Sequence, residues 1–507
     1  MRGNTGLLDL PYNTGGNFTV ANIGEFRGIC PKTAPVRNFD ITALAAGALP
    51  GGKLIYNSRT GVGGHGAIHD PNAIFYAHTS LVDANGMFDP NAPVEPLVMR
   101  AAAGECIEVT LRNRLPAPPP DQDGYNTLPM IIDRFNANQV KPSGHVGLHA
   151  QLVSFDVTRS DGTNVGFNPV QTAAPGDSVT YQWYAGDLIL QPDNRIQATP
   201  REFGAVNLIS SDPIEHASKG AIGALVIEPQ GAVWEEGLTQ SQNLSQAYPS
   251  HMQATVWLPS GFRFREFVVL VQDDLNLRYG SGAPIENLAE AEDAEDSGQK
   301  AFNYRTEPLW FRKGYAPDTP LTTTRTFDFR NVLSNSQVGG DPKTPVFQVE
   351  VGTPVRMRVL QPGGHARNHV FQMHGHIWQE LPYVNASSAL GDNPLSEWKG
   401  AQGMHGPTNH FDVLFRKAGG GYGILGDYLF RDQSSFLFDG GLWGIMRVLP
   451  VGALGGEFNP IQPCTTCPNE PCPYPAKSTG ETIQCTPLEP TPPEIPTEPY
   501  PATTPRD

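Results

Sequence analysis

The sequence predicts an all-β protein that consists of two tandem β-sandwich domains and a tail rich in proline and cysteine. Three observations support this fold class. The 507 residues include 54 glycines and 48 prolines, which suit a chain with many turns and do not suit a helical bundle. Apolar residues alternate with polar ones along several short segments, as they do on strands with one buried face. Two of these segments have a counterpart later in the chain.

The counterparts form two internal repeats. Residues 104–111 and residues 352–359 both begin with glycine and then carry apolar side chains at alternate positions, which predicts a half-buried strand in each. Residues 220–229 and 441–450 match better: glycine fills the first and fourth places, a strand-like apolar run follows, and proline fills the tenth. Two β-sandwich domains related by duplication account for both repeats.

The repeats and changes in composition divide the chain into five parts. We expect a leader, a first sandwich domain, a linker, a second sandwich domain and a tail, with limits at residues 1–27, 28–234, 235–250, 251–450 and 451–507. The tail is expected to be largely disordered, because proline-rich polar sequence favours an extended chain. The acidic run 286–296 is expected to be a solvated loop or short helix, with a cation-collecting patch as the alternative.

The six cysteines fall into two groups: Cys30 and Cys106 in the body, and Cys464, Cys467, Cys472 and Cys485 in the tail. A tail rich in thiols and proline is typical of a disulfide-bearing appendage outside the cytoplasm. The alternative is a four-cysteine zinc site that includes the pair Cys464 and Cys467.

Charge and hydropathy exclude some partners. The net charge of −16 argues against nucleic acid and anionic membrane as partners. No apolar run of 18 or more residues predicts a membrane span. The N-terminal sequence lacks the apolar region of a signal peptide, so the chain is either cytoplasmic or the rear part of a longer exported protein. Because of the tail cysteines, we expect an extracytoplasmic location, which means periplasmic, secreted or cell-surface.

A histidine-rich segment of the second predicted domain is the strongest chemical signal. Residues 368–380 read NHVFQMHGHIWQE and place His369, His374 and His376 within eight residues. Such density predicts a metal site, and alternation along a strand is expected to point His374 and His376 to the same face. The alternative is that all three are hydrogen-bonded core residues beneath neighbouring aromatic side chains.

Four segments resemble the histidine motifs of one enzyme family. Residues 369–376 resemble the motif His-Pro-x-His-x-His-Gly-His, and residues 431–437 occupy the place of His-Cys-His-x3-His. Residues 147–150 resemble an early His-x-His-Gly motif, and residues 208–211 take the place of a His-x-His motif. Over roughly residues 30–450 the sequence therefore resembles the multicopper oxidase family, and most closely its large multidomain bacterial members of the manganese-oxidase type.

The resemblance implies tandem cupredoxin domains, which are Greek-key β-sandwiches, and a copper-dependent oxidoreductase. It also implies a mononuclear blue-copper site with one cysteine and two histidines. His369 matches the first histidine, but Asp432 stands in place of the cysteine and Leu437 in place of the second histidine. An aspartate cannot reproduce the soft, covalent bond of a thiolate to copper, so we expect no blue-copper centre.

The resemblance further implies a trinuclear oxygen-reducing cluster held by eight histidines in four pairs. The matching pairs are Gly147 and His149, Ile209 and Ser211, Gln372 and His374, and Arg431 and Gln433. Two histidines of eight cannot hold three copper ions, and Arg431 adds a permanent positive charge where the cations belong. We therefore expect that this chain alone does not reduce oxygen to water by the family mechanism.

A single copper ion is still expected as a candidate cofactor in the histidine-rich segment. Its candidate ligands are His369, His374 and His376 with His145 or His149 nearby, and its hydrogen-bonding support is Glu380 or Gln372.

Three functional hypotheses follow. The first is a multicopper-oxidase-family protein that is a portion or a degenerate member and works with other cupredoxin domains or chains. The second is a non-catalytic structural or interaction module of the cell exterior. The third is a copper or manganese carrier that uses the three histidines and the acidic surface.

Overall fold

The structure is a computed structural model with side chains. It describes residues 20–59, 66–121, 141–212, 214–238, 249–275, 277–286, 288, 299–318, 329–364, 368–384, 389–433 and 435–454. The tail with its four cysteines, most of the leader and most of the acidic run lie outside these residues. The described residues belong to one compact unit that spans residues 1–458. No helix in the described part is long and apolar enough to cross a bilayer.

The prediction of an all-β fold is confirmed, because strands dominate the described residues and the helices are short. The α-helices are α2 (Leu309–Lys313) and α3 (Ser435–Asp439). The strands of the first half are β1 (Phe26–Arg27), β2 (Cys30–Pro31), β3 (Val36–Ala45), β4 (Leu54–Asn57), β5 (Ile68–Asp70), β6 (Ile74–His78), β7 (Leu97–Ala102), β8 (Cys106–Asn113), β9 (Leu148–Ala150), β10 (Ser154–Phe155), β11 (Ser178–Tyr184), β12 (Gly186–Leu190), β13 (Ile196–Pro200), β14 (Gly204–Ser210) and β15 (Gly223–Glu228).

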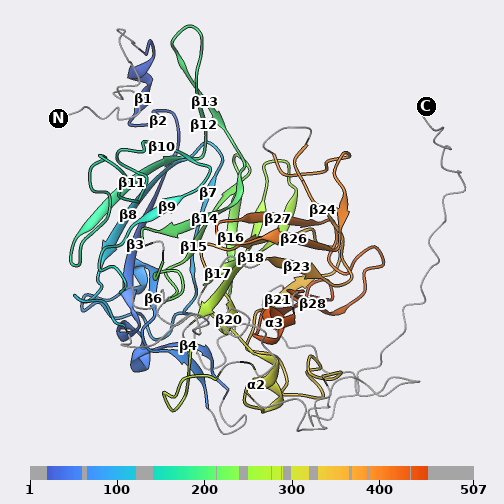
Figure 1. Cartoon of the computed structure of the whole chain (residues 1–507). Helices are drawn as coiled ribbons and strands as arrows, with labels where there is room; N and C mark the ends of the chain where they lie inside the picture. Colours follow the sequence, from blue (N-terminus) through green and yellow to red (C-terminus); the bar gives the residue numbers. More distant parts are fainter. Residues whose placement is uncertain are drawn as a thin grey trace, which may run out of the picture. The chain divides into compact units, whose positions relative to one another are not determined.

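The first strand of the second half overlaps the segment that we expected to be a linker. Its strands are β16 (Val233–Leu238), β17 (Pro249–Trp257), β18 (Arg263–Leu275), β19 (Arg278–Tyr279), β20 (Gln299–Phe302), β21 (Val346–Glu350), β22 (Val355–Leu360), β23 (His369–Met373), β24 (Trp378–Gln379), β25 (Trp398–Lys399), β26 (Ala401–His405), β27 (His410–Phe415), β28 (Gly426–Asp432) and β29 (Trp443–Leu449). In Figure 1 most strands of the first half lie on the left, β16, β17 and β18 lie near the middle, and the strands from β21 onward lie on the right.

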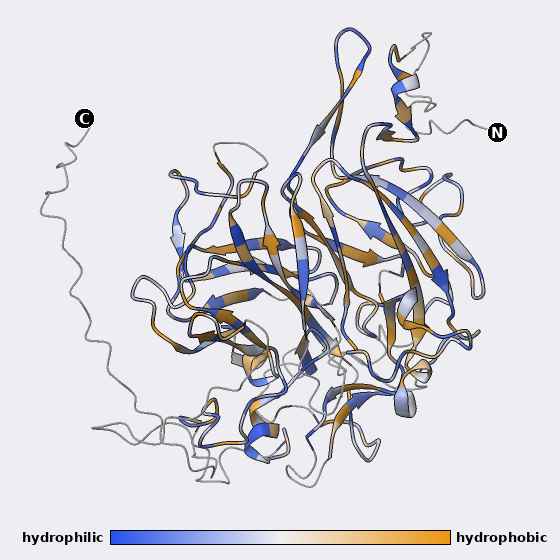
Figure 2. Ribbon diagram, turned by 180° about the vertical axis from the view of Figure 1, so that it is seen from behind, coloured by the Kyte–Doolittle hydropathy of each residue, from blue (hydrophilic) through white to orange (hydrophobic). Residues whose placement is uncertain are grey.

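Each half is a sandwich of two sheets. In the first sandwich the sheets have the orders β10-β11-β8-β3-β6 and β7-β15-β14-β9. In the second sandwich the orders are β16-β17-β18-β22-β27, with β20 also on β18, and β21-β29-β28-β23-β26. Many of the strands carry apolar and polar residues in alternation (Figure 2), so that one face of each sheet contributes to a core.

The strand pairing repeats from one sandwich to the other. β3 lies parallel to β8 as β18 lies parallel to β22, and β7 lies parallel to β15 as β21 lies parallel to β29. The antiparallel partners correspond as well, because β11 borders β8 where β27 borders β22, and β14 borders β15 where β28 borders β29. This pairing supports duplication of one cupredoxin-like sandwich, while the exact domain limits stay a prediction.

The repeated glycines are required by the backbone. Gly104 and Gly352 turn the chain into β8 and β22 with φ values of 88° and 79°, which glycine adopts without steric cost. The glycines at the fourth place of the other repeat have a different reason. A Cβ atom at Gly223 would lie 2.9 Å from the carbonyl oxygen of Leu97, and one at Gly444 would lie 2.7 Å from that of Pro345. Both positions are therefore restricted by a closely packed neighbouring segment.

The strands that follow Gly104 and Gly352, β8 and β22, differ in burial. β8 is half-buried, as the alternation predicts, because Ile107, Val109 and Leu111 face the core. The same prediction is wrong for β22, where every residue is buried, including Arg356 and Arg358. The polar face of β22 is covered by the first sandwich, since β14 packs against β22 and β27. Sequence alternation identified the strand but not the neighbour on its other face.

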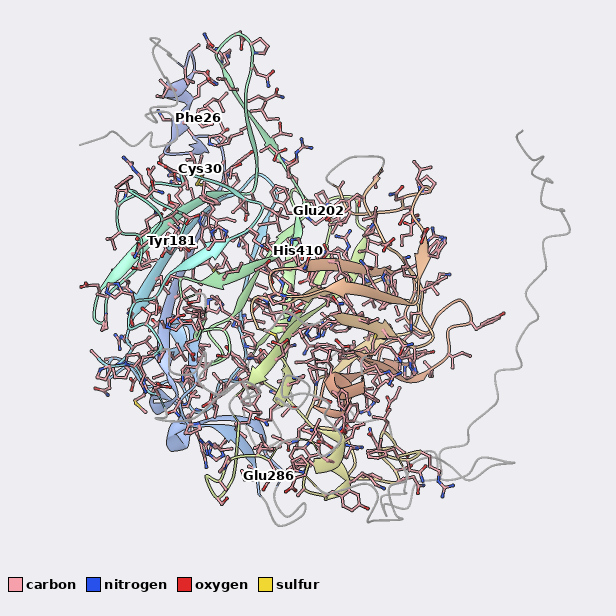
Figure 3. All side chains as sticks on the ribbon, viewed as in Figure 1. Phe26, Cys30, Tyr181, Glu202, Glu286 and His410 are labelled. Carbon is pink, nitrogen blue, oxygen red and sulfur yellow. A yellow bond between two sulfur atoms is a disulfide. The ribbon has the colours of Figure 1, made fainter. Side chains whose placement is uncertain are left out.

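Charged side chains cross the contact between the two sandwiches. Arg358 Nη2 donates to Glu228 Oε2 at 3.0 Å across this contact, Arg358 Nε donates to Glu266 at 2.8 Å, and Nη1 donates to Asp412 at 2.8 Å. We call Arg358, Glu228, Glu266 and Asp412 the Arg358 cluster; all four are buried. A further ion pair, Arg356 with Glu202, crosses the same contact at 2.6 Å, and Glu202 is labelled in Figure 3.

A disulfide joins Cys30 and Cys106, which are 76 residues apart in the sequence. It links β2 to the first residue of β8, and both cysteines are fully buried. The sequence placed these two cysteines in the body but did not pair them.

Candidate functional site

His369 is the first residue of β23 and lies inside the second sandwich with no exposed surface. Its Nδ1 is 2.7 Å from Asp432 Oδ2 at the end of β28, and its Nε2 is 3.1 Å from Asp273 Oδ2 on β18. We call His369, Asp273 and Asp432 the His369 array. Because each ring nitrogen faces a carboxylate, both nitrogens act as donors, which requires the charged imidazolium.

The electrostatics of the array agree with its geometry. Burial by itself lowers the pKa of His369, but the hydrogen bonds to Asp273 and Asp432 outweigh it and raise the pKa to about 9. Gln361 adds a donor to Asp273, with its Nε2 at 3.2 Å from Oδ2. The backbone also approaches closely, since a Cβ atom at Gly364 would lie 1.7 Å from Asp273 Oδ1. The structure thus holds a fixed cation between two carboxylates.

His374 and His376 do not share a face, so this part of the sequence prediction is wrong. β23 ends at Met373, and Gly375 then turns the chain with a φ of 67°. As a result His374 is exposed, whereas His376 is buried. The alternation of a strand does not continue past the strand's last residue.

The ring of His376 is fully engaged. Its Nδ1 donates to the carbonyl oxygen of His374 at 3.1 Å, and its Nε2 accepts from the backbone N–H of Gly419 at 3.2 Å. The ring packs between Phe415 and Tyr428, with centroid distances of 4.8 Å and 4.7 Å. Burial lowers the pKa of His376, which keeps the ring neutral. This is the environment that the alternative interpretation assigned to the histidines, as hydrogen-bonded residues among aromatic side chains.

His145 and His149 belong to the first sandwich and are engaged there. His149, on β9, has its Nδ1 2.9 Å from the carbonyl oxygen of Asp161. His145 has its Nδ1 3.1 Å from Thr172 Oγ1. The structure therefore does not join these histidines to His369, His374 or His376 in one cluster. Among the described residues, no group of three or more His, Cys, Asp or Glu side chains is arranged to hold a metal ion.

The residues at the positions that the resemblance assigns to a blue-copper site do not fit such an ion. His369 Nδ1 is hydrogen-bonded to Asp432, which is the residue at the cysteine position. Leu437, at the second histidine position, lies in α3 and is buried in the apolar core. The donor set therefore offers one imidazole whose two nitrogens are both occupied, one hard carboxylate and one hydrocarbon side chain, and it offers no sulfur.

The residues at two of the trinuclear-cluster pairs do come together. Gln372 and Arg431 face each other across β23 and β28. Arg431 Nε donates to Gln372 Oε1 at 3.0 Å, and its Nη2 donates to Gln433 Oε1 at 2.6 Å. In the first sandwich, Ile209 pairs with His149 across β14 and β9. Gln372 is therefore a neighbour of Arg431, and Ile209 is a neighbour of His149, in the structure.

Sequence reasoning missed Asp273. It lies 96 residues before His369, on a strand of the other sheet, and no motif surrounds it. It also missed the Arg358 cluster, whose four residues come from four strands. The signal that was available is the run Val355-Arg-Met-Arg-Val359, which places two arginines on one face of a strand.

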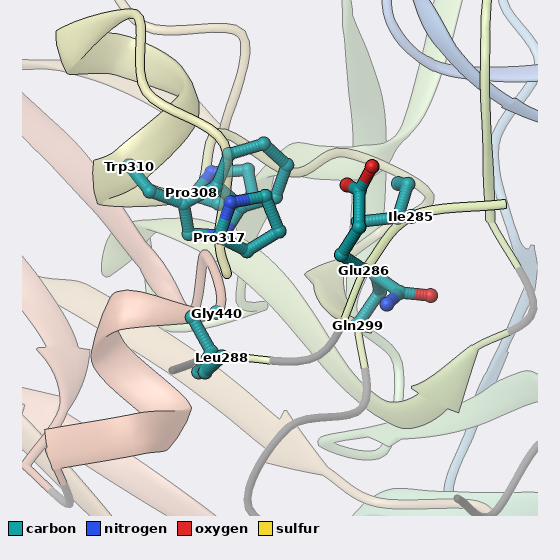
Figure 4. A pocket seen from close by; sticks show the side chains of 8 residues that line it. All are labelled: Ile285, Glu286, Leu288, Gln299, Pro308, Trp310, Pro317 and Gly440. Atoms are coloured by element: carbon teal, nitrogen blue, oxygen red, sulfur yellow. The ribbon is translucent and has the colours of Figure 1, made fainter. Parts of the chain in front are cut away.

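A pocket lies apart from these residues, between the segment around α2, the segment that ends at Leu288, and Gly440 (Figure 4). The space between these residues is about 220 Å³, and this volume includes open solvent. Its lining is mostly apolar, and the carboxylate of Glu286 at its edge accepts a 2.6 Å hydrogen bond from Tyr279. None of the histidines predicted as ligands lines it.

No protein-family model and no curated protein matches the sequence. Several solved structures are similar to the chain at low identity and low TM-score. A blue copper oxidase from Nitrosomonas europaea is 14% identical, with a TM-score of 0.40 over 84% of this chain and 92% of its own. A copper nitrite reductase from the same organism is 13% identical, with a TM-score of 0.39 over 82% and 94%. Another multicopper oxidase is 12% identical, with a TM-score of 0.40 over 82% and 89%.

Similarities of this size carry no information about ligands or activity. The cupredoxin-like sandwich is consistent with the strand pairing of this chain, and the narrower resemblance to manganese-oxidase members stays a prediction.

Proposed function

We propose that this chain is a degenerate multicopper-oxidase-type protein that acts as a non-catalytic binding or structural module. The observation that carries the proposal is the His369 array, which occupies the positions where the resemblance puts a blue-copper centre. An imidazolium between two carboxylates has both of its ring N–H groups hydrogen-bonded, so neither ring nitrogen is open to a metal ion. To bind copper there, His369 must lose a proton and break at least one of the hydrogen bonds to Asp432 and Asp273.

The side chains of this region also lack the donor atoms that an electron-transfer copper site needs. A blue-copper site passes electrons because a short copper–thiolate bond gives it a suitable potential and little reorganisation. Asp432 supplies a carboxylate and Leu437 supplies no donor atom, so the array cannot perform that role. Any oxidation chemistry is then carried by other cupredoxin domains or chains that associate with this one.

We further propose an extracytoplasmic location. The buried disulfide between Cys30 and Cys106 supports it, because disulfides persist in oxidising compartments and are rare in the cytosol. A module with this disulfide and a net charge of −16 suits the periplasm, the cell surface or the exterior.

Copper titration of the purified chain tests the proposal. We expect no intense visible absorption when Cu(II) is added to the wild-type protein, since no thiolate lies beside His369. The double variant Asp432→Cys, Leu437→His is the matched comparison, because it restores both missing donors at the same positions and is expected to gain such an absorption. An intense band near the red end of the spectrum in the wild-type protein contradicts the proposal.

A further inference from the structure

Arg431 is hydrogen-bonded to side-chain amides, whereas Arg356 and Arg358 are hydrogen-bonded to carboxyl groups. Its two hydrogen bonds go to the amide oxygens of Gln372 and Gln433, and both amides are uncharged. Arg358 and Arg447, in contrast, each bind at least two carboxylates. Among the described residues Arg431 forms no ion pair. A full positive charge without a bound carboxylate is thus present on the second sandwich.

The guanidinium of Arg431 is held in place. Nε and Nη2 are fixed by the two amide oxygens at 3.0 Å and 2.6 Å, and the plane lies over the ring of Phe438, 4.4 Å from its centroid. Stacking on an aromatic ring and two directed hydrogen bonds remove most of the freedom that an exposed arginine has. Because the side chain is already ordered, less conformational entropy is lost when a ligand binds to it.

Among the described residues, the hydrogen bonds of Arg431 leave unused donors beside its positive charge. Both amide oxygens already accept from Arg431, so the NH₂ groups of Gln372 and Gln433 remain to donate. Within the described residues no acceptor is bonded to these NH₂ groups or to Arg431 Nη1. Gln433 is exposed and Gln372 is half-buried, so that the group is open to solvent on one side. The exposed His374, two residues from Gln372, flanks it.

The neighbouring carboxylates do not neutralise Arg431. Asp432 follows it in the chain, but Asp432 is buried and bonded to His369. Asp439 is on α3, one residue from Phe438, and is half-buried with its Oδ1 turned into the protein. Burial lowers the pKa of Arg431 and Asp432 acts in the opposite direction, so the guanidinium stays charged at any physiological pH.

We propose that Arg431, Gln372 and Gln433 bind an oxyanion, which is a carboxylate or a tetrahedral group such as phosphate or sulfate. Such a group supplies acceptor oxygens and negative charge, which the described residues do not provide here. It can bind Arg431 through Nη1 and the remaining hydrogen of Nη2, the edge of the guanidinium that the glutamines leave open. A metal cation is disfavoured at the same place by the charge of Arg431. The inference depends on this surface alone and not on the proposed function of the His369 array.

Calorimetric titration of the full chain with three sodium salts tests the site. Inorganic phosphate, inorganic sulfate and acetate are used in separate arms at low ionic strength, so that tetrahedral and planar oxyanions are distinguished. We expect saturable binding of at least one of them with one site per chain. In Arg431→Gln the affinity for that anion is expected to fall by roughly tenfold or more, because the charge-assisted hydrogen bonds are lost.

A second variant removes binding while it keeps the arginine. Gln433→Glu places a carboxylate 2.6 Å from Arg431 Nη2, where it competes with any added anion, and we expect a loss as large as in Arg431→Gln. Arg416→Gln is the matched control, since it removes an equal charge from the same sandwich, where Arg416 pairs with the exposed Asp392. Its affinity is expected to stay within about twofold of wild type.

Two results overturn the inference. One is a folded wild-type chain that shows no saturable binding of any of the three anions. The other is binding that Arg431→Gln and Gln433→Glu leave unchanged, which assigns the anion to a different surface.

Discussion

The His369 array and the Arg358 cluster both bury a cation among carboxylates, but only one of the two cations can lose its proton. His369 lies between two carboxylates inside the second sandwich, and Arg358 lies among three where the two sandwiches meet. A guanidinium keeps its charge at every pH that a folded protein survives, whereas an imidazolium titrates. The two regions therefore contribute to stability with a different dependence on pH.

The two regions compensate the burial of their charged groups in different ways. Burial of a charge is costly unless a partner and hydrogen bonds compensate it. In the Arg358 cluster, the excess negative charge is reduced by a proton: burial and the charge of Glu266 raise the pKa of Glu228 well above its usual range. In the His369 array the cation itself carries the adjustable proton.

The largest expected effect is that of Arg358→Met. The substitution keeps much of the side-chain volume but leaves Glu228 and Asp412 buried without their cation, and it leaves Glu266 with Arg100 alone, 2.8 Å away. Loss of one partner from a buried ion network typically costs about 3 to 5 kcal/mol, so we expect the free energy of unfolding in urea to fall by about that amount. Arg416→Met, at an exposed ion pair, is the control and is expected to change it by less than about 1 kcal/mol. Equal effects in the two variants contradict the role of the cluster.

The next effect is a pH-dependent one at His369. Its pKa is raised from the ordinary 6.5 to about 9, which corresponds to about 3 kcal/mol of stability. Because the folded-state pKa is the higher one, this contribution is fully present below pH 6.5 and is lost as the pH rises through 9. We expect urea unfolding to show that loss in wild type and not in His369→Gln.

Other groups titrate in the same pH range, but the comparison of wild type with His369→Gln removes their contribution. Burial raises the pKa of Asp70 and of Glu215 to about 7 in each case. Both are present in wild type and in His369→Gln, so their contributions cancel in the difference between the two proteins. The same pH dependence in both proteins contradicts a charged His369.

The sequence was most informative where the backbone itself restricts the residue. The repeated glycines predicted paired strands because a turn or a close neighbour excludes a side chain at Gly104 and Gly223. It was least informative where distant strands meet, since nothing near Asp273 in the chain indicates that it faces His369. The histidine segment was misjudged at one residue, because the left-handed Gly375 ends the alternation on which the prediction relied.

A smaller effect is expected when one carboxylate is removed from each region. Asp432→Asn leaves His369 with Asp273 alone, so we expect the pKa of His369 to fall below about 9 and the free energy of unfolding to drop by about 2 kcal/mol. In Asp412→Asn, Arg358 keeps its charge, the carboxylate of Glu266 and the protonated carboxyl group of Glu228. The loss of stability in this variant is therefore expected not to vary between pH 6.5 and 9. Proton NMR of the ring and urea unfolding at several pH values measure both quantities.

The smallest effect distinguishes two glutamates that lie beside one another. Since Glu228 is held protonated, Glu228→Gln replaces a neutral group by a neutral group and is expected to change the free energy of unfolding by less than about 1 kcal/mol. Burial raises the pKa of Glu266, but Arg358 and Arg100 outweigh it and lower that pKa. Glu266→Gln therefore removes a real charge and is expected to cost several times more. Equal costs for the two variants contradict this assignment of the proton.

The ring titration of His369, followed by NMR in the absence and presence of Cu(II), tests the central claim most directly. The account predicts a pKa of about 9 that added copper does not change, because both ring nitrogens are bonded to carboxylates. A ring that titrates near 6.5, or a His369 signal that one equivalent of Cu(II) broadens together with an intense visible absorption, would contradict it.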